Sequence, residues 1–270
     1  MLYIASVHYK SPRWIEIQRE HLREHISVPF QTWTSLEGID SSYGRFFDRV
    51  LVQRGLHAAK LNHLALEISH VASPSDLIMF LDGDAFPIAD PMPLISAALE
   101  RAPLVAVRRA ENADEPQPHP SFCVTTLRTW QRLHGDWCAG HTWPSPRGTP
   151  TSDVGGNLLR SLELTGTPWV PVLRSNRRDL DPLYFGIYGE VIYHHGAGFR
   201  TGELSPAHRA QAPAPLGISS VPGLSLPARA FGRLRWRRWE RSLEAHHVSQ
   251  SELIYERIRA GGSGWLKQLS

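Results

Sequence analysis

A continuous run of five apolar residues, Leu77 to Leu81, constrains the fold of this chain more than any other feature of its sequence. Turn-forming residues bound the run, with "SPSD" before it and Asp82-Gly83-Asp84 after it. A short run that is apolar at every position is typical of a strand buried on both faces of a sheet. Such strands lie in parallel sheets covered by helices on both sides, so the run predicts an α/β fold.

Strand-like and helix-like segments alternate through the first hundred residues. Strands are expected at 2–8, 77–81 and 104–108, and helices from Ser11 to Ile26, at 55–72 and at 93–101. Ser11-Pro12 suits a helix start, because serine caps and proline fits the first turn. Within 55–72, Leu61, Leu64, Ile68 and Val71 recur at spacings of three, four and three, which gives one apolar stripe. The alternation predicts a mixed, mostly parallel, Rossmann-like sheet flanked by helices.

The composition of the chain changes at about residue 205 and separates a first domain from a C-terminal region. Further strands are expected at 121–127 and 191–195, and a helix after Asp153 that Gly166 would end. From residue 205 the sequence "SPAHRAQAPAPLGISSVPGLSLPA" holds five prolines and no acid, which is typical of a linker. We therefore expect a catalytic domain over 1–204, and over 205–270 a proline-rich linker with a basic helical C-terminal extension.

Composition and charge exclude several classes of protein. With 41% hydrophobic and 20% charged residues among 270, the chain has the balance of a globular protein and not of a disordered one. The net charge of +3 gives no argument for nucleic acid as a partner. No run approaches the length of a membrane span, and the start lacks the basic residues of a secretory signal. Cys123 and Cys138 are expected to be reduced thiols in a cytoplasmic protein.

The pair Asp82 and Asp84 is the strongest candidate for chemistry. Both residues lie just beyond the carboxyl end of the predicted buried strand, where open α/β sheets bind ligands. Residues i and i+2 of an extended chain point the same way, so the two carboxylates can share one Mg²⁺ or Mn²⁺ ion. Gly83 keeps side-chain bulk out of the turn. The alternative is an ordinary turn, since Asp-Gly-Asp is also good turn chemistry.

These residues resemble a known family. "DLIMFLDGDAFPI" (76–88) is similar to the strand and D-x-D motif of nucleotide-diphospho-sugar glycosyltransferases with the GT-A fold. "HAAKLNHLAL" (57–66) resembles the helix before that strand, and "VIYHHGAGFR" (191–200) resembles a late segment in which a histidine completes the metal site. The resemblance covers about residues 2–200. It implies that Asp82, Gly83 and Asp84 contact a donor diphosphate through the divalent cation.

The resemblance also implies a third metal ligand. His194 and His195 are adjacent and would face opposite sides of a strand, so only one is expected to face the cation. His195 begins an H-x-x-G pattern closer to that of the family, so we place it first and His194 second. Arg200 follows in a glycine-rich turn and is expected to hold a diphosphate oxygen. The alternative for His194 and His195 is that they are half-buried residues at the end of a strand, and the alternative for Arg200 is a solvated loop residue.

Further positions are expected to contact the nucleotide. By resemblance, the base and ribose lie over the first strand, at Ala5, Ser6, Val7 and His8. Lys60 is a candidate for a phosphate contact and Asn62 for a hydroxyl contact on ribose or sugar. The alternative for Val7 is a packing role in the core, and the alternative for Lys60 is a position on the solvated face of a helix.

Sugar transfer with inversion also needs a carboxylate that takes the acceptor proton, whereas retaining enzymes often lack an obvious base. Asp153 is the candidate catalytic residue, although Thr-Ser-Asp before a helix is also a good cap. Asp179 and Asp181 are weaker candidates. Trp137 and Trp143 are candidates for stacking on an acceptor sugar or for packing.

The segment 229–241 holds six arginines and one acid, interleaved with aromatic residues. A basic helix of this kind suits peripheral contact with an anionic membrane at its inner face, and a packed helix with solvated arginines is the alternative.

The sequence thus predicts a metal-dependent, hexosyltransferase-type enzyme. Its donor is expected to be a UDP-sugar, with a GDP-sugar second, and a bacterial cell-surface saccharide or glycolipid suits as acceptor. The alternatives are a nucleotidyltransferase and a non-catalytic sugar-nucleotide binding protein. A phosphatase of the haloacid-dehalogenase type is disfavoured, because Ala85-Phe86 follows the acids and the motif comes late in the chain.

Overall fold

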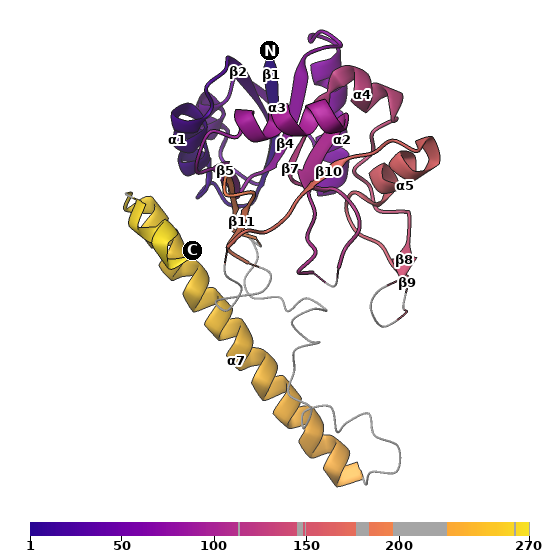
Figure 1. Cartoon of the computed structure of the whole chain (residues 1–270). Coiled ribbons are helices and arrows are strands. Elements are labelled where there is room, and N and C mark those ends of the chain that lie inside the picture. Colours follow the sequence, from indigo (N-terminus) through magenta and orange to yellow (C-terminus); the bar gives the residue numbers. More distant parts are fainter. Residues whose placement is uncertain are drawn as a thin grey trace. The chain divides into compact units, whose positions relative to one another are not determined.

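A computed structural model gives the architecture of the chain (Figure 1). It describes residues 1–112, 114–144, 148, 150–176, 184–196, 226–261 and 263–269. The chain divides into two compact units, Met1–Phe199 with Leu269–Ser270, and Arg200–Gln268. Of the expected linker at 205–228, residues 205–225 lie outside the described residues and the last three belong to a helix that begins at Leu226. The predicted boundary at 204 stays a prediction.

A seven-stranded sheet with the order β10-β6-β7-β4-β1-β2-β3 forms the centre of the first unit. Its strands are β1 (Leu2–Tyr9), β2 (Phe30–Glu37), β3 (Arg49–Leu51), β4 (Leu77–Asp82), β6 (Leu104–Val107), β7 (His119–Thr126) and β10 (Val170–Val172). The pairs β1–β2, β1–β4, β2–β3 and β6–β10 are parallel, and β7 is antiparallel to both β4 and β6. The predicted mixed, mostly parallel sheet is confirmed.

Helices cover both faces of this sheet, as Figure 1 shows. Among its described residues the first unit has the helices α1 (Ile15–His25), α2 (His57–Ser69), α3 (Met92–Arg101), α4 (Leu127–Arg132) and α5 (Gly156–Thr165), with the short helix η1 (Ser41–Phe46). One core lies between the sheet and α2, α4 and α5. The other lies between the sheet and α1 and α3. Because β4 contributes to both cores, its residues Ile78 to Leu81 are fully buried, which explains the continuous apolar run.

Two predicted helix starts differ from the structure. Helix α1 begins at Ile15 after Trp14, without a side-chain cap, while the backbone N–H of Ser11 donates to the carbonyl of Tyr9. Helix α5 begins at Gly156 after Gly155, whose φ of 89° is left-handed. Neither Ser11 nor Asp153 therefore caps its helix. Gly166 ends α5 in the left-handed conformation, as predicted.

A second, three-stranded antiparallel sheet places the late segment of this unit. Its order is β11-β12-β5, with β11 at Gly186–Tyr188, β12 at Ile192–His194 and β5 at Ala85–Pro87. The short β5 comes directly after the Asp82-Gly83-Asp84 turn, and in its pairing with β12 Ala85 lies opposite His194. The strands β8 (Trp143–Pro144) and β9 (Pro150–Thr151) form a separate two-stranded ribbon.

The second unit contains one long helix, α7 (Leu226–Arg259), followed by the short helix η3 (Ser263–Gln268). The predicted basic helix at 229–247 is thus part of a longer one. In the described ranges no helix is long and apolar enough to cross a membrane. Cys123 and Cys138 are free thiols, as expected.

The apolar stripe of α2 provides a test of the core. Leu61, Leu64 and Ile68 are fully buried, but the predicted fourth member, Val71, comes after the helix ends at Ser69 and is 62% exposed. Leu64 is fully buried against the sheet and Leu66, on the same helix, is 54% exposed. Replacing Leu64 by alanine is expected to lower the free energy of unfolding by about 2–5 kcal/mol, because the cavity it leaves is only partly filled by relaxation. Leu66→Ala, the matched control, is expected to change it by less than about 0.5 kcal/mol. Urea unfolding followed by circular dichroism measures both, and equal losses would contradict the assigned core.

Candidate metal and donor site

The turn at Asp82-Gly83-Asp84 packs tightly against the end of the first strand. Val7 of β1 lies opposite Asp82 in the parallel pairing of β1 with β4. A Cβ atom placed on Gly83 would lie 2.5 Å from the carbonyl oxygen of Val7 and 2.8 Å from Nδ1 of His8. Only glycine fits at this distance. The glycine therefore serves the approach of the turn to β1, in addition to the room for a ligand that the sequence suggested.

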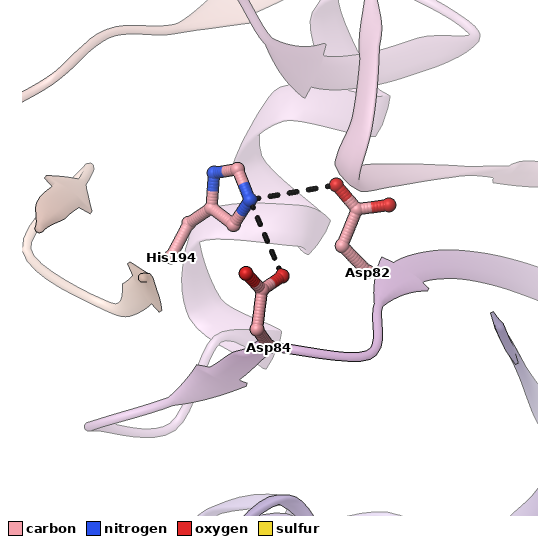
Figure 2. Close-up of side chains that lie close together, drawn as sticks. All are labelled: Asp82, Asp84 and His194. Carbon is pink, nitrogen blue, oxygen red and sulfur yellow. Dashed lines mark ion pairs between the residues drawn. The ribbon is translucent and has the colours of Figure 1, made fainter. Parts of the chain in front are cut away.

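Three side chains converge beyond the carboxyl end of β4 (Figure 2). Asp82, Asp84 and His194 each offer a ligand atom, and these atoms all lie within 4.8 Å of one another. Nε2 of His194 lies 3.5 Å from Oδ2 of Asp82 and 3.5 Å from Oδ1 of Asp84. The pairing of β12 with β5 brings the histidine to the two acids across more than a hundred residues of chain.

The electrostatics of His194 follow from its neighbours. Burial by itself lowers the pKa of this imidazole, but the carboxylates of Asp84 and Asp82 outweigh burial, so the pKa of His194 is raised. All three side chains are largely buried, at 9% exposure for His194, 14% for Asp82 and 13% for Asp84. Two carboxylates and an imidazole gathered out of solvent are a set of side chains that could hold a metal ion.

The predicted order of the two histidines is reversed. His194 faces the acids, whereas His195, which the sequence placed first, is directed to the opposite side. The ring of His195 lies 4.4 Å from that of Trp14, and its Nδ1 is 2.9 Å from the hydroxyl of Tyr193. Adjacent residues of a strand point to opposite faces, so when His194 faces the two acids, His195 faces away from them.

These three residues fit a divalent cation. Their donor set of two carboxylates and one imidazole suits Mn²⁺, and the carboxylates alone suit Mg²⁺. Oδ1 of Asp82 is buried and accepts no hydrogen bond, which leaves its negative charge uncompensated by any such bond. Three protein ligands leave coordination positions open for a ligand such as a diphosphate.

A buried glutamine fixes the turn from behind. Nε2 of Gln18, on α1, donates to the carbonyl oxygens of Asp82 at 2.8 Å and Ala85 at 2.7 Å. Its Oε1 is therefore an acceptor, and it lies 3.2 Å from Nε2 of His8. His8 thus donates this bond as a neutral ring. Burial lowers the pKa of His8 to about 4, although Gln18 and the charge of Asp84 act in the opposite direction.

The other predicted nucleotide contacts on β1 are buried strand residues. Ala5 is fully buried, Val7 is 5% exposed, and Ser6 is 2% exposed. Oγ of Ser6 donates to Oγ1 of Thr34 on the neighbouring strand β2 at 3.2 Å. The side chains of these residues support the sheet, and a contact between their backbone and a base stays a prediction.

The two polar candidates on α2 have partners within the protein. Lys60 is 2% exposed, forms an ion pair with Glu37 and lies 4.8 Å from the ring centre of Tyr9. A phosphate contact requires this ion pair to open. Asn62 donates to Oδ1 of Asp136 at 2.6 Å and accepts from the backbone N–H of Trp137 at 2.9 Å. Both ends of this amide support the loop at 136–137. The hydroxyl contact of Asn62 stays a prediction.

Asp153 belongs to a polar cluster around Arg109. Its Oδ2 accepts from Nη2 of Arg109 at 3.1 Å, and its Oδ1 accepts from the backbone N–H of Val154 at 2.8 Å. Nη2 of Arg109 also donates to Glu115 at 2.8 Å. Burial raises the pKa of Glu115 despite the neighbouring guanidinium. The side chain of Asp153 is 42% exposed, so its carboxylate faces solvent while Arg109 and the N–H of Val154 fix its orientation.

Sequence reasoning missed two histidines next to the three ligands. The ring of His119, at the start of β7, lies 5.9 Å from that of His194. Burial and then the charges of Arg109 and its histidine neighbours hold the pKa of His119 well below its usual value. His57, the first residue of α2, places Nε2 3.2 Å from Oδ1 of Asp82. No sequence motif links His57 or His119 to the three ligands, because the two histidines lie on different elements, far apart in the sequence.

The remaining candidates are packing residues or lie outside the described part of the chain. Trp137 is fully buried, with its ring 5.0 Å from that of Phe80, and Trp143 is 8% exposed. Both are therefore enclosed by protein. Arg200, Asp179 and Asp181 lie outside the described residues, so their predicted roles stay predictions.

Comparisons with known proteins give similar structures only. No family model matches the sequence, and no curated protein does. Among solved structures, the mannosyltransferase PcManGT from Pyrobaculum calidifontis, in complex with GDP-Man and Mn²⁺, is 14% identical with a TM-score of 0.45, over 94% of this chain and 86% of its own. An active-site mutant of LgtC is 12% identical with a TM-score of 0.41, over 77% and 93%.

The TarS protein of S. aureus is a further match. Its 1–349 fragment is 11% identical with a TM-score of 0.38, and the chain spans 50% of that fragment and 30% of a longer TarS structure. All of these matches have TM-scores below 0.5, so they are similar structures only and carry no argument about this chain. Identities this low do not establish an activity, so the function proposed below rests on the geometry of this chain.

The buried neutral ring of His8 makes stability depend on pH. Its pKa in the folded protein, about 4, is below the ordinary value of 6.5, so the unfolded chain binds the proton more tightly. Stability from this group is complete above pH 6.5 and is lost as pH falls towards 4. Between pH 7.5 and pH 5 the loss is expected to be about 2 kcal/mol.

His8→Gln retains an amide donor for Gln18 and removes the titration. We expect this variant to lose about 2 kcal/mol less than the wild type between the two pH values, whereas His70→Gln at an exposed position should leave the loss unchanged. Urea unfolding at both pH values measures the difference. An unchanged pH dependence in His8→Gln would show that His8 is not buried as a neutral ring.

Proposed function

We propose that this protein is a metal-dependent glycosyltransferase that takes a sugar from a nucleotide-diphosphate donor, with a UDP-sugar first and a GDP-sugar second. The observation that carries the proposal is the convergence of Asp82, Asp84 and His194 beyond the carboxyl end of β4. Ligands of open α/β sheets bind at this edge. A cation held there by three protein ligands has positions left for the oxygens of a diphosphate.

In this proposal the residues of the chain have separate tasks. Asp82, Asp84 and His194 hold the cation, which supplies neutralising charge to the departing diphosphate. Gln18 and Gly83 hold the two acids in place through the backbone of the turn. Hydrogen bonds of this kind orient ligating groups and support their affinity for the metal.

Asp153 remains the proposed catalytic carboxylate. Arg109 and the N–H of Val154 fix its orientation, and its exposed side is available to an acceptor hydroxyl. The proposed task of Asp153 is to hold the acceptor hydroxyl and to receive its proton. The acceptor we propose is a saccharide or glycolipid.

Calorimetric titration with UDP and GDP, with and without Mn²⁺, tests the proposal. We expect one nucleotide to bind only with Mn²⁺, because the acids alone repel the diphosphate. Asp84→Asn, which keeps the shape and removes the charge, is expected to weaken this binding by more than the ~10–100-fold that loss of a supporting residue costs. Glu100→Gln, at an exposed position of α3, is the matched control.

The outcomes separate the alternatives. Absence of nucleotide binding in the folded wild type under all conditions contradicts the proposal and returns Asp82-Gly83-Asp84 to an ordinary turn. Metal-dependent binding without release of nucleotide diphosphate from any sugar donor, with or without acceptors, favours the non-catalytic binding protein. Release of pyrophosphate from a nucleoside triphosphate and a sugar phosphate favours the nucleotidyltransferase.

We also propose that helix α7 contacts an anionic membrane surface, which would bring the enzyme to a glycolipid acceptor at the inner face. Seven of its described residues are exposed arginines, and five of these lie within 233–241: Arg233, Arg235, Arg237, Arg238 and Arg241. Leu234, 68% exposed, lies among these five, and Phe231, 63% exposed, comes just before them. Arginines attract acidic headgroups, and apolar side chains beside them add affinity by insertion.

Vesicle flotation tests the contact. Vesicles with acidic lipid are expected to bind the protein, with less binding at higher salt, and neutral vesicles are expected to leave it in solution. The double variant Arg237→Gln/Arg238→Gln should bind roughly 30-fold more weakly, from about 1 kcal/mol per basic side chain near the surface. Arg257→Gln/Arg259→Gln, near the other end of α7, is the control. Equal binding to both kinds of vesicle would contradict the electrostatic contact.

A further inference from the structure

Gln117 is a buried amide without a hydrogen-bond partner at either end. The residue is 1% exposed, and neither its Oε1 nor its Nε2 has a partner among the described residues. Gln18 is buried to the same extent, yet its amide has partners at both ends, on the Asp82-Gly83-Asp84 turn and on His8. A buried polar group without a partner lowers the stability of a protein, so the unpaired amide of Gln117 calls for an explanation.

The backbone at Gln117 is fixed by prolines on both sides. In "EPQPHP" (115–120), Gln117 and His119 each precede a proline, which restricts both to extended backbone. Residues i and i+2 of an extended chain point to the same side, so the side chain of Gln117 leaves the chain on the side of His119. The ring of His119 lies 5.9 Å from that of the metal ligand His194. One neighbour of the amide is therefore the metal site.

The other neighbour of Gln117 is the turn that carries Asp153. A Cβ atom placed on Gly155 would lie 2.2 Å from the carbonyl oxygen of Pro118 and 3.4 Å from Cγ of Gln117. The φ of Gly155, 89°, also favours glycine. This glycine thus lets the turn approach the segment 117–118, two residues after the proposed catalytic carboxylate.

The space between these two neighbours is where a transferred sugar would lie. This step rests on the proposed function. In the proposed reaction the anomeric carbon is bonded to a diphosphate oxygen on the cation and is attacked by an acceptor hydroxyl held at Asp153. Neighbouring hydroxyls of a sugar can donate to an amide oxygen and accept from an amide nitrogen, so they match both unpaired ends of Gln117.

We infer that Gln117 hydrogen-bonds hydroxyls of the transferred sugar and contributes to the choice of donor sugar. Because Pro116 and Pro118 hold the backbone, rotation about the side-chain bonds is the movement that presents the buried amide to the sugar. A site built to hydrogen-bond a hydroxyl discriminates against sugars without one at that position, since the amide then stays unpaired.

Calorimetric titration in the presence of Mn²⁺ tests the inference. The probes are UDP and GDP, and UDP-glucose, UDP-galactose and GDP-mannose. Gln117→Met keeps the length of the side chain and removes its hydrogen-bonding groups. We expect it to bind the sugar nucleotide that the wild type prefers about 10-fold more weakly, and the matching nucleotide diphosphate equally well. Gln131→Met, at an exposed position of α4, is the control and should match the wild type.

Thermal unfolding followed by circular dichroism gives a second measurement. Because the amide of Gln117 has no partner in the described chain, Gln117→Met should unfold at the temperature of the wild type or above it. Gln18→Met loses the bonds to the turn and should unfold at least about 2–4 °C lower. An equally large decrease for Gln117→Met would overturn the inference, because the amide would then be a structural residue.

The titrations separate this inference from the proposed function. If the wild type binds neither nucleotides nor sugar nucleotides with Mn²⁺, the proposed function fails and the role of Gln117 fails with it. If the wild type binds both and Gln117→Met has the same affinity for sugar nucleotides, only the role of Gln117 is wrong. An equal loss of affinity for a nucleotide diphosphate and its sugar nucleotide would also overturn that role, because the contact would not be with the sugar.

Discussion

The candidate site depends on the antiparallel pairing of β5 with β12. Both strands are three residues long, and β5 begins directly after Asp84. Because Ala85 lies opposite His194, the pairing sets this histidine beside the two acids. The backbone N–H of His195 donates to the carbonyl of Asp84 at 3.0 Å, which extends the same contact to the turn itself. Loss of this pairing would leave two acids at a sheet edge without the imidazole that completes the ligand set.

The turn between β4 and β5 is held equally firmly from the other directions. Gly83 lies against the backbone of β1, and Gln18 binds the carbonyls on both sides of the turn. The acids are therefore preorganised. Folding of the surrounding core holds the two carboxylates close together in spite of their electrostatic repulsion. A cation offsets their repulsion, which is the physical reason for expecting metal and donor to bind together.

The sequence predicted the parts of this arrangement that are local. The apolar run of β4, the acids after it and the stripe of α2 all follow from period and composition. The choice between His194 and His195 was wrong, because alternation along a strand shows that adjacent residues face opposite sides and gives no sign of which side. That choice depends on the partner strand β5. Lys60 and Asn62 illustrate the same limit, since their partners Glu37 and Asp136 lie far away in the sequence.

Diffraction from crystals grown with Mn²⁺, measured at the manganese absorption edge, tests the central claim most directly. The account predicts one strong anomalous peak bonded to Asp82, Asp84 and His194, and its loss in crystals of Asp84→Asn. A well-ordered site without a peak at saturating Mn²⁺, or a peak bonded to neither acid, would contradict it.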